Sequence, residues 1–269
     1  MGAKSHRISM MPIVKGLAER GHNVTVVSPN KWSEVIEGVR EIQVKSIFVG
    51  VGGTSFNWFE MNENSGVPKK TFDIFKNLVN TAFKPMFTTL MDNQEFHQLL
   101  KDHKVDLVII DDSFHDFTLP VIEELIGAPF ILHSASTGYP WSWAAVGASQ
   151  ELASVPGRMS RFNNEMAFHE RLSNTLITSI MMGMRNWYMI PALDEAVKER
   201  LPNARSISAI QNEASLLFFC SKFATSWPRP LPPTAIPLGP LHVRPALPLP
   251  QVPIGNIMTI FDVCHETGI

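Results

Sequence analysis

The sequence predicts an α/β fold: a Rossmann-like, mostly parallel sheet with flanking helices. Three observations support this expectation. Short apolar segments alternate along the chain with longer segments of helical periodicity, which is the order of βαβ units. Several of the short segments are apolar throughout, as parallel strands buried on both faces are. Hydrophobic residues make up 45% of the 269 residues and charged residues 18%, so the chain can bury a sizeable core.

The first helix and the first strand have the clearest signals. Apolar side chains recur at helical spacing from Ser5 to Arg20, where Ser5 suits the N-cap and Gly21 suits the residue after the helix. The run from Asn23 to Ser28 is short and rich in β-branched residues, as a buried strand is. A second strand is expected from Glu41 to Val49, ended by glycines.

The middle of the chain is expected to form a helical region followed by a strand, a helix and another strand. The helical region is predicted from about Lys69 to Lys104, with a break before Pro85 because proline removes a helical hydrogen bond. An apolar strand follows from Val105 to Ile110. A helix from about His115 to Ile126 and a strand from Phe130 to His133 complete this part.

The last third of the predicted domain begins with a loop region at residues 134–157, which are rich in Ser, Gly, Ala and Trp. Helices are predicted from Met159 to Arg185 and from Pro191 to Arg200. Ala214 to Ser221 is apolar enough to form a further buried strand.

The composition changes sharply at the end of this domain. Residues 1–227 are interpreted as one Rossmann-like domain. Ten prolines between residues 228 and 253 forbid regular helix, so this segment is interpreted as a Pro-rich linker or clasp. Residues 254–269 are expected to be a divergent tail, too short to fold alone.

The bulk properties argue against several classes of function. A formal net charge of −2 gives no electrostatic footprint for a nucleic-acid partner. The two cysteines, Cys220 and Cys264, provide neither a disulfide framework nor a zinc site. No stretch has the pattern of a signal peptide or a membrane span, and Leu176 to Pro191, interrupted by Arg185, predicts an amphipathic helix.

Glycine motifs that bind cofactors do not occur. There is no G-x-G-x-x-G and no G-x-x-x-x-G-K-[ST], which argues against nicotinamide, flavin and ATP, so no cofactor is predicted. The absence of G-x-S-x-G likewise argues against an α/β-hydrolase.

His6 and Asp111 are the candidate catalytic residues. His6 lies at the start of the first predicted helix, and Asp111 follows the apolar strand that ends at Ile110. In an open α/β sheet, ligands bind at the carboxyl ends of strands and the amino ends of helices. A carboxylate can orient an imidazole there so that the imidazole acts as a general base. The alternative is that His6 is a frayed terminal residue and Asp111 a helix N-cap.

Two further sets of residues allow more than one interpretation. Asp111 and Asp112 together could bind a divalent metal, but the favoured interpretation is that one of them caps the following helix. Aromatic residues in the predicted loops could line a pocket for a hydrophobic small molecule, or could be ordinary core. These aromatic residues are Phe56, Trp58, Phe59, Tyr139, Trp141, Trp143, Phe162 and Phe168.

A series of segments in order along the chain resembles the animal UDP-glycosyltransferases (the UDP-glucuronosyltransferase family). The segments are Ser5-His6 with Pro12, residues 17–29, Asp106 to Asp111, residues 155–171 with Met166, Phe168 and Arg171, residues 212–216, residues 227–233, and Gly239-Pro240-Leu241-His242. The resemblance covers about residues 2–251, which is nearly the whole chain.

This resemblance implies the N-terminal, acceptor-binding domain of a GT-B fold. A hexose or glucuronic acid would pass from a UDP-sugar to a small lipophilic hydroxyl acceptor, with inversion and without a metal. His6 would be the general base and Asp111 its partner. The expected acceptor-binding residues are Phe56, Trp58, Tyr139, Trp141, Phe162 and Phe168. The resemblance also implies a location in the membrane or lumen of the endoplasmic reticulum.

The chain departs from the family pattern at both ends. The family has a strand before the Ser-His segment, where this chain has Met1 to Lys4, and the donor-domain motifs Trp-x-Pro-Gln and Thr-His-Gly-Gly do not occur. We therefore expect a truncated form that lacks the donor domain and has little turnover alone. The alternative function is a non-catalytic, acceptor-binding or regulatory protein that associates with itself or with a full-length transferase.

Overall fold

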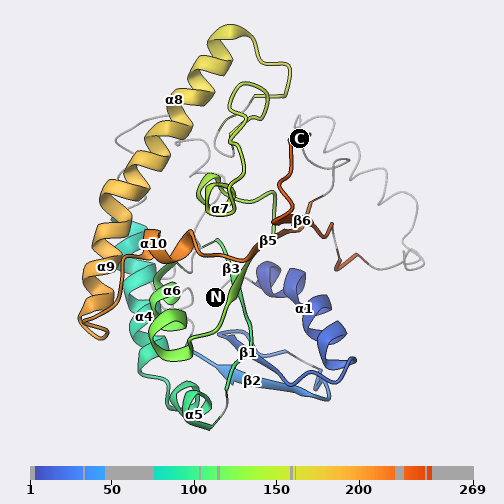
Figure 1. Cartoon of the computed structure of the whole chain (residues 1–269), viewed down its shortest axis with the longest axis vertical. Coiled ribbons are helices and arrows are strands. Elements are labelled where there is room, and N and C mark those ends of the chain that lie inside the picture. Colours follow the sequence, from blue (N-terminus) through green and yellow to red (C-terminus); the bar gives the residue numbers. More distant parts are fainter. Residues whose placement is uncertain are drawn as a thin grey trace, which may run out of the picture.

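The strands that the structure describes all pair in parallel. The structure is a computed structural model, and it describes residues 4–32, 34–45, 76–102, 104–113, 116–157, 160, 162–221, 227–239 and 241–243. One sheet has the order β1-β2 and the other the order β3-β4-β5-β6 (Figure 1). The strands are β1 Val24–Ser28, β2 Val39–Gln43, β3 Val108–Asp111, β4 Phe130–Ser134, β5 Leu216–Phe219 and β6 Ala235–Pro237.

Helices surround these sheets. The α-helices are α1 Lys4–Ala18, α4 Lys84–Met91, α5 Gln94–Asp102, α6 Leu119–Val121, α7 Pro140–Ala145, α8 Phe168–Met184, α9 Ile190–Lys198 and α10 Ile207–Gln211. The π-helical turns are η1 Val79–Phe83, η3 Ile122–Ile126 and η4 Arg185–Met189, and η2 Asp116–Thr118 is a 3₁₀ turn. Helix α1 packs against β1, whereas α4, α6, α9 and α10 gather on the other side of the molecule (Figure 1).

The core lies between the four-stranded sheet and this second group of helices. Leu217 of β5 and Ile207 of α10 are completely buried, and Leu193 and Val197 of α9 are almost so. All five residues of β4 are buried, as expected for a central parallel strand covered on both faces. The predicted class, an α/β fold with a mostly parallel sheet and flanking helices, is confirmed.

Helices continue through two prolines at which the sequence suggested an end. The helix does not break before Pro85, and the helices around Pro191 are continuous, with Arg185 to Met189 linking α8 to α9. In each case a π-turn precedes the proline, with Lys84 N–H bonded to the carbonyl of Val79 and Ile190 N–H to that of Arg185. The wider turn makes room for a ring that would otherwise clash with a carbonyl one turn earlier.

Other element boundaries also differ from those predicted. Helix α8 begins at Phe168 and not at Met159, because the Glu170 carboxylate accepts a hydrogen bond from the Ala167 N–H (2.7 Å) and closes the first turn there. The expected loop at 134–157 contains α7, and β2 begins and ends earlier than predicted. Within the proline-rich segment, β6 pairs with β5 as an edge strand, which is where a strand tolerates proline.

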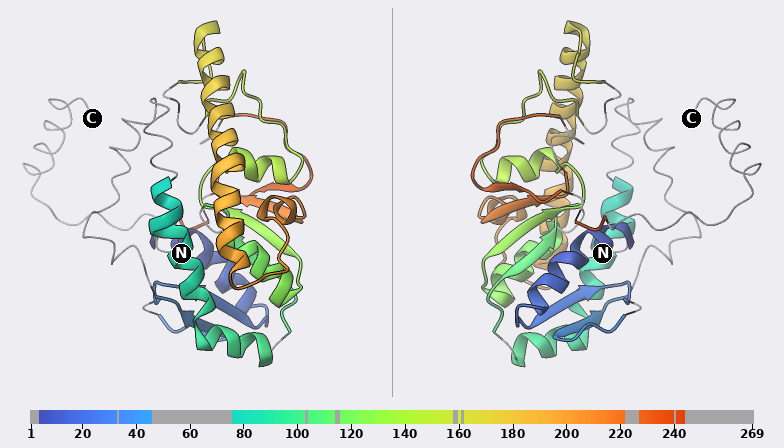
Figure 2. Two further views of the ribbon diagram at one scale, coloured as in Figure 1. Left: turned by 90° about the vertical axis from the view of Figure 1, so that its left-hand side faces the viewer. Right: turned by 90° about the vertical axis from the view of Figure 1, so that its right-hand side faces the viewer.

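Helix α8 has an unusual distribution of side chains. Its polar residues Asn174 and Thr178 are buried, while apolar side chains at intervals of four residues are exposed. The exposed side chains are Phe168, Leu172, Leu176 and Ile180, which we call the α8 ridge. The helix projects beyond the sheet (Figures 1 and 2). Among the described residues, no helix has the length and apolarity needed to cross a bilayer.

We predict that Leu217→Ala lowers the free energy of unfolding by about 2–5 kcal/mol, because it removes a fully buried side chain from the middle of the sheet. Leu176→Ala, the same substitution on the α8 ridge, should change it by less than about 0.5 kcal/mol. Urea denaturation followed by circular dichroism measures both. Equal losses in the two variants would contradict this placement of the core.

Candidate active site

His6 and Asp111, 105 residues apart in the chain, meet at the carboxyl end of β3. The Nδ1 atom of His6 lies 2.8 Å from Oδ2 of Asp111. Asp111 is the last residue of β3 and has a side chain 7% exposed, while the His6 side chain, in the first turn of α1, is 19% exposed. The dyad therefore pairs a buried carboxylate with an imidazole that reaches the surface.

Neighbouring residues hold the first turn of α1 in place. Arg7 is buried, and its guanidinium donates to Glu41 of β2 (2.5 Å) and to the carbonyl of Asn30 beyond β1. Its guanidinium also lies 5.5 Å from the ring centre of Trp32. The Ser9 hydroxyl donates to the carbonyl of His6 (2.7 Å). These contacts fix the backbone on both sides of the imidazole.

The contact between the two side chains determines what the imidazole can do. With Asp111 as the acceptor, Nδ1 carries the hydrogen and Nε2 is left as an unprotonated acceptor. An imidazole held in this way can take a proton from a hydroxyl group, and the carboxylate stabilises the imidazolium that forms.

Asp112 lies beside the dyad in a buried setting of its own. Its N–H bonds to the carbonyl of His133 (2.9 Å), and the Ser113 hydroxyl bonds to its carboxyl group (3.2 Å). Burial, reinforced by the charge of Asp111, raises the pKa of Asp112 to about 7. Asp111 and Asp112 therefore differ in character, since one faces an imidazole and the other favours its neutral form.

His133 forms the next layer of the site. It lies opposite Asp111 in the register of β3 and β4 and is completely buried. Burial lowers the pKa of His133 to about 4, with Asp111 acting in the opposite direction and His6 in the same one. Its Nε2 lies 3.4 Å from Sγ of Cys220, whose thiol pKa is raised mainly by burial. The pair is therefore a neutral imidazole and a neutral thiol.

The residues expected to bind an acceptor do not all lie together. Phe56 and Trp58 lie outside the described residues. Tyr139 and Trp141 are buried and stacked on each other, with ring centres 4.6 Å apart. The guanidinium of the buried Arg185 covers Trp141 at 4.9 Å, so this stack belongs to the interior. Phe168 is 81% exposed on the α8 ridge.

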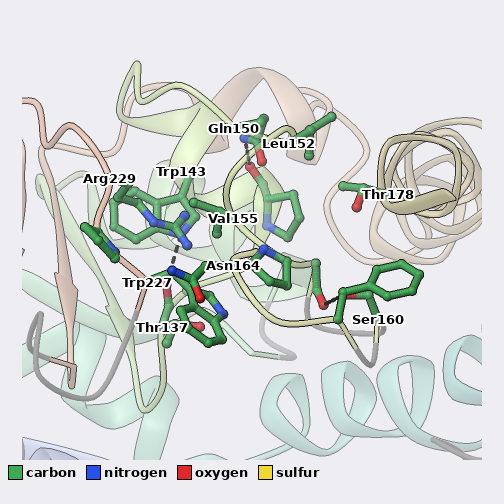
Figure 3. A pocket seen from close by; sticks show the side chains of 16 residues that line it. Thr137, Trp143, Gln150, Leu152, Val155, Ser160, Asn164, Thr178, Trp227 and Arg229 are labelled. Atoms are coloured by element: carbon green, nitrogen blue, oxygen red, sulfur yellow. Dashed lines mark hydrogen bonds between the residues drawn. The ribbon is translucent and has the colours of Figure 1, made fainter. Parts of the chain in front are cut away.

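Phe162 lines a pocket of about 710 Å³ between the 137–164 loop region, α8 and the segment 227–229 (Figure 3). Trp143 and Trp227 contribute aromatic surface, and Thr178 of α8 forms the opposite wall. Neither His6 nor Asp111 is among the residues that line it.

Sequence reasoning missed His133 and the distinct role of Asp112. The signal for His133 was its position, because it closes an apolar strand at the same edge of the sheet as Asp111. For the Asp111–Asp112 pair we considered a metal. Within the described part of the chain, no group of three or more His, Cys, Asp or Glu side chains could hold one.

A parallel α/β sheet with an acid and an imidazole at its carboxyl edge places the chain among Rossmann-like α/β proteins. The family model described as "UDP-glucoronosyl and UDP-glucosyl transferase" matches residues 2–257. The chain belongs to this family, as the resemblance in its sequence indicated.

Individual relatives are more distant. Rat 2-hydroxyacylsphingosine 1-beta-galactosyltransferase is 32% identical over 163 residues, covering 60% of this chain and 29% of the relative. Bovine UDP-glucuronosyltransferase 3A1 is 27% identical over an alignment that covers 92% of this chain and 47% of the relative. UDP-glycosyltransferase UGT5 of Dactylopius coccus is 25% identical over an alignment that covers 93% of this chain and 47% of the relative. The chain thus spans about half the length, or less, of these curated relatives. No solved structure gives a significant match.

The shifted groups at this site should make stability depend on pH in two opposing ways. In the unfolded chain Asp112 loses its proton near pH 3.8, but in the native chain it keeps the proton up to about pH 7. The contribution of Asp112 to the stability of the fold therefore falls as pH rises through this interval. His133 has the opposite effect. In the unfolded chain it binds a proton near pH 6.5, whereas in the native chain it does so only near pH 4. Its contribution to stability is therefore lost as the pH falls through this interval.

We predict that Asp112→Asn becomes more stable relative to the unmodified protein as pH rises from 4 to 7, by roughly 2–4 kcal/mol. The neutral amide removes the cost of ionising this buried group. Denaturant unfolding at several pH values measures the difference, with the exposed Asp106→Asn as the control. A difference that stays constant across this interval would contradict the assignment.

Proposed function

We propose that this chain is the acceptor-binding part of a UDP-glycosyltransferase, in which His6 is the general base and Asp111 orients it. The observation that supports this most strongly is the 2.8 Å contact between Nδ1 of His6 and the buried carboxylate of Asp111. It gives a family member the base and orienter that a glycosyl transfer to a hydroxyl group needs.

In the proposed reaction, Nε2 of His6 takes the proton of the acceptor hydroxyl as its oxygen attacks the anomeric carbon of the UDP-sugar. The bond between that carbon and the diphosphate oxygen breaks, and UDP leaves with the electron pair. Attack from the face opposite the leaving group inverts the anomeric centre. Asp111 stabilises the imidazolium during this step.

The substrates are divided between two parts of the proposed enzyme. This chain would bind the acceptor, a small lipophilic hydroxyl compound, within reach of His6. Phe162, which the resemblance assigns to acceptor binding, lines a pocket that neither member of the dyad lines. The donor part would bind the UDP-sugar and stabilise the charge on the diphosphate leaving group. A location in the endoplasmic reticulum belongs to the same proposal.

We predict that the chain alone shows little or no turnover with UDP-sugars and a panel of phenols and steroids. Robust formation of conjugates by the chain alone would contradict this division. In equilibrium dialysis, at least one acceptor from the panel should bind to the chain, and UDP should bind much more weakly.

The dyad is tested by joining this chain to the donor part of a relative such as bovine UDP-glucuronosyltransferase 3A1. If the chimaera is active, His6→Gln and Asp111→Asn should each lower kcat by about 10²–10⁴-fold. His22→Gln, which alters an exposed histidine beyond α1, serves as the control and should retain activity. Retained activity in His6→Gln would exclude it as the base.

A second candidate function is a non-catalytic partner of a full-length transferase. The α8 ridge favours it, because four large apolar side chains stand exposed on a projecting helix. In this case, Leu172→Ser with Leu176→Ser should abolish co-purification with an intact transferase. Leu125→Ser, at a less exposed apolar site away from the ridge, should not. Unchanged co-purification in the double variant would exclude the ridge as the interface.

A further inference from the structure

Among the described residues, the pocket beside α8 is lined by one charged side chain. Of the sixteen described residues that line it, Arg229 is charged and the rest are neutral (Figure 3). The neutral residues include aromatic and aliphatic side chains as well as Gln150, Ser160 and Asn164. A pocket of about 710 Å³ with apolar surface and a few polar groups has the size and composition of a small-molecule site.

One wall of this pocket is fixed by a buried amide. The Asn174 side chain donates to the carbonyls of Leu152 (2.8 Å) and Val155 (3.0 Å) and accepts from the N–H of Gly157 (2.7 Å). A Cβ atom on Gly157 would lie 2.8 Å from the hydroxyl of Thr178, so the loop approaches α8 as closely as a glycine allows. The loop is thus held in position without a ligand.

The opposite wall is fixed in a similar way. The indole N–H of Trp143 donates to the carbonyl of Thr137 (2.9 Å), and Gly138 adopts a φ of +83° directly beneath it. A Cβ atom there would lie 2.7 Å from the indole nitrogen. The Gln150 amide donates to the carbonyl of Pro140 (2.6 Å). The pocket is therefore preformed, because the Asn174, Trp143 and Gln150 side chains that hold its walls are already hydrogen-bonded.

Arg229 is the exception. Its guanidinium carbon lies 4.6 Å from the ring centre of Trp143, and the side chain is half-buried. Among the described residues it makes no hydrogen bond and no ion pair. Burial lowers the pKa of Arg229, and the charge of Glu151 acts in the opposite direction. Stacking on Trp143 satisfies the face of the guanidinium and leaves its N–H edge for another group.

We propose that this pocket binds an organic carboxylate, with the carboxylate on the N–H edge of Arg229 and an aromatic or aliphatic body against Trp143, Trp227 and Phe162. The planar fork of a guanidinium matches a carboxylate in two parallel hydrogen bonds. No acidic side chain is among the described residues that line the pocket. The site goes beyond the proposed transfer reaction, because neither member of the dyad lines it.

The test compares 5-phenylvalerate with its neutral amide, 5-phenylvaleramide, by isothermal titration calorimetry on the full chain. The two probes share their apolar body and differ in charge. The carboxylate should bind at least about tenfold more tightly, and added salt should reduce the difference. Equal affinities, or no saturable binding of either probe, would overturn the proposal.

Variants assign the preference to one side chain. Arg229→Gln should abolish the tenfold preference, while Arg40→Gln removes the same charge from an exposed position on β2 and should preserve it. An unchanged preference in Arg229→Gln would overturn the proposal. His6→Gln should bind both probes as the unmodified chain does, so failure of the transferase proposal is distinguishable from failure of this one.

A further variant keeps the test informative if Arg229→Gln does not fold. Asn164 is an exposed residue at the pocket, and Asn164→Trp should fill part of the space while leaving the guanidinium intact. Both probes should then bind at least about tenfold more weakly. Unchanged binding would place the probes elsewhere on the protein and overturn the proposal. Circular dichroism confirms that each variant is folded.

Discussion

One buried negative charge, on Asp111, organises the carboxyl edge of the sheet. A carboxylate that is withdrawn from water needs a hydrogen-bonding partner, and the imidazole of His6 provides it. The same charge disfavours a second ionised carboxylate beside it and so contributes to the raised pKa of Asp112. Burial keeps His133 neutral on the next strand. The charge at the carboxyl end of β3 is thus concentrated in the pair of Asp111 and His6. Of the four residues, His6 is the one that reaches the surface.

The parallel register accounts for this concentration. Because β3 and β4 run side by side, Asp111 and His133 face each other at the ends of their strands, and Cys220 follows directly after β5. Polar side chains distant in sequence therefore meet in one layer beneath the dyad. Of these neighbours, His133 and Cys220 are both neutral near pH 7. The pocket beside α8 is separate from the dyad. Its walls are mostly loops, which the side-chain amides of Gln150 and Asn174 hold in place.

Most of the architecture could be predicted from the sequence, because it depends on local periodicity. Helix α1, strand β1 and strand β4 have uninterrupted patterns and lie where expected. The pairing of His6 with Asp111 could be proposed only through the general rule for strand ends and through family resemblance, since their separation in space has no local signal. The catalytic roles of the two residues are still proposals.

What could not be predicted depends on contacts between distant parts of the chain. Asn174 looks like an ordinary polar helix residue, and nothing local reveals that its amide holds a loop some twenty residues earlier. The exposure of Leu176 and its neighbours has the same origin, because tertiary packing turned the polar side of α8 inward. Arg229 stood in a run of prolines that suggested a linker, and its stacking on Trp143 appears only in three dimensions.

The widened turns before Pro85 and Pro191 each contain one residue more than an α-helix needs to cover the same arc. Deleting a residue from Arg185–Met189 would convert that turn into an α-helical one and leave the helix after it in nearly the same direction. Leu193 and Val197 would keep facing the core. The ring of Pro191 would then press against a carbonyl one turn earlier. A single-codon deletion here would therefore act through backbone strain at the proline and not through a lost register of the apolar face.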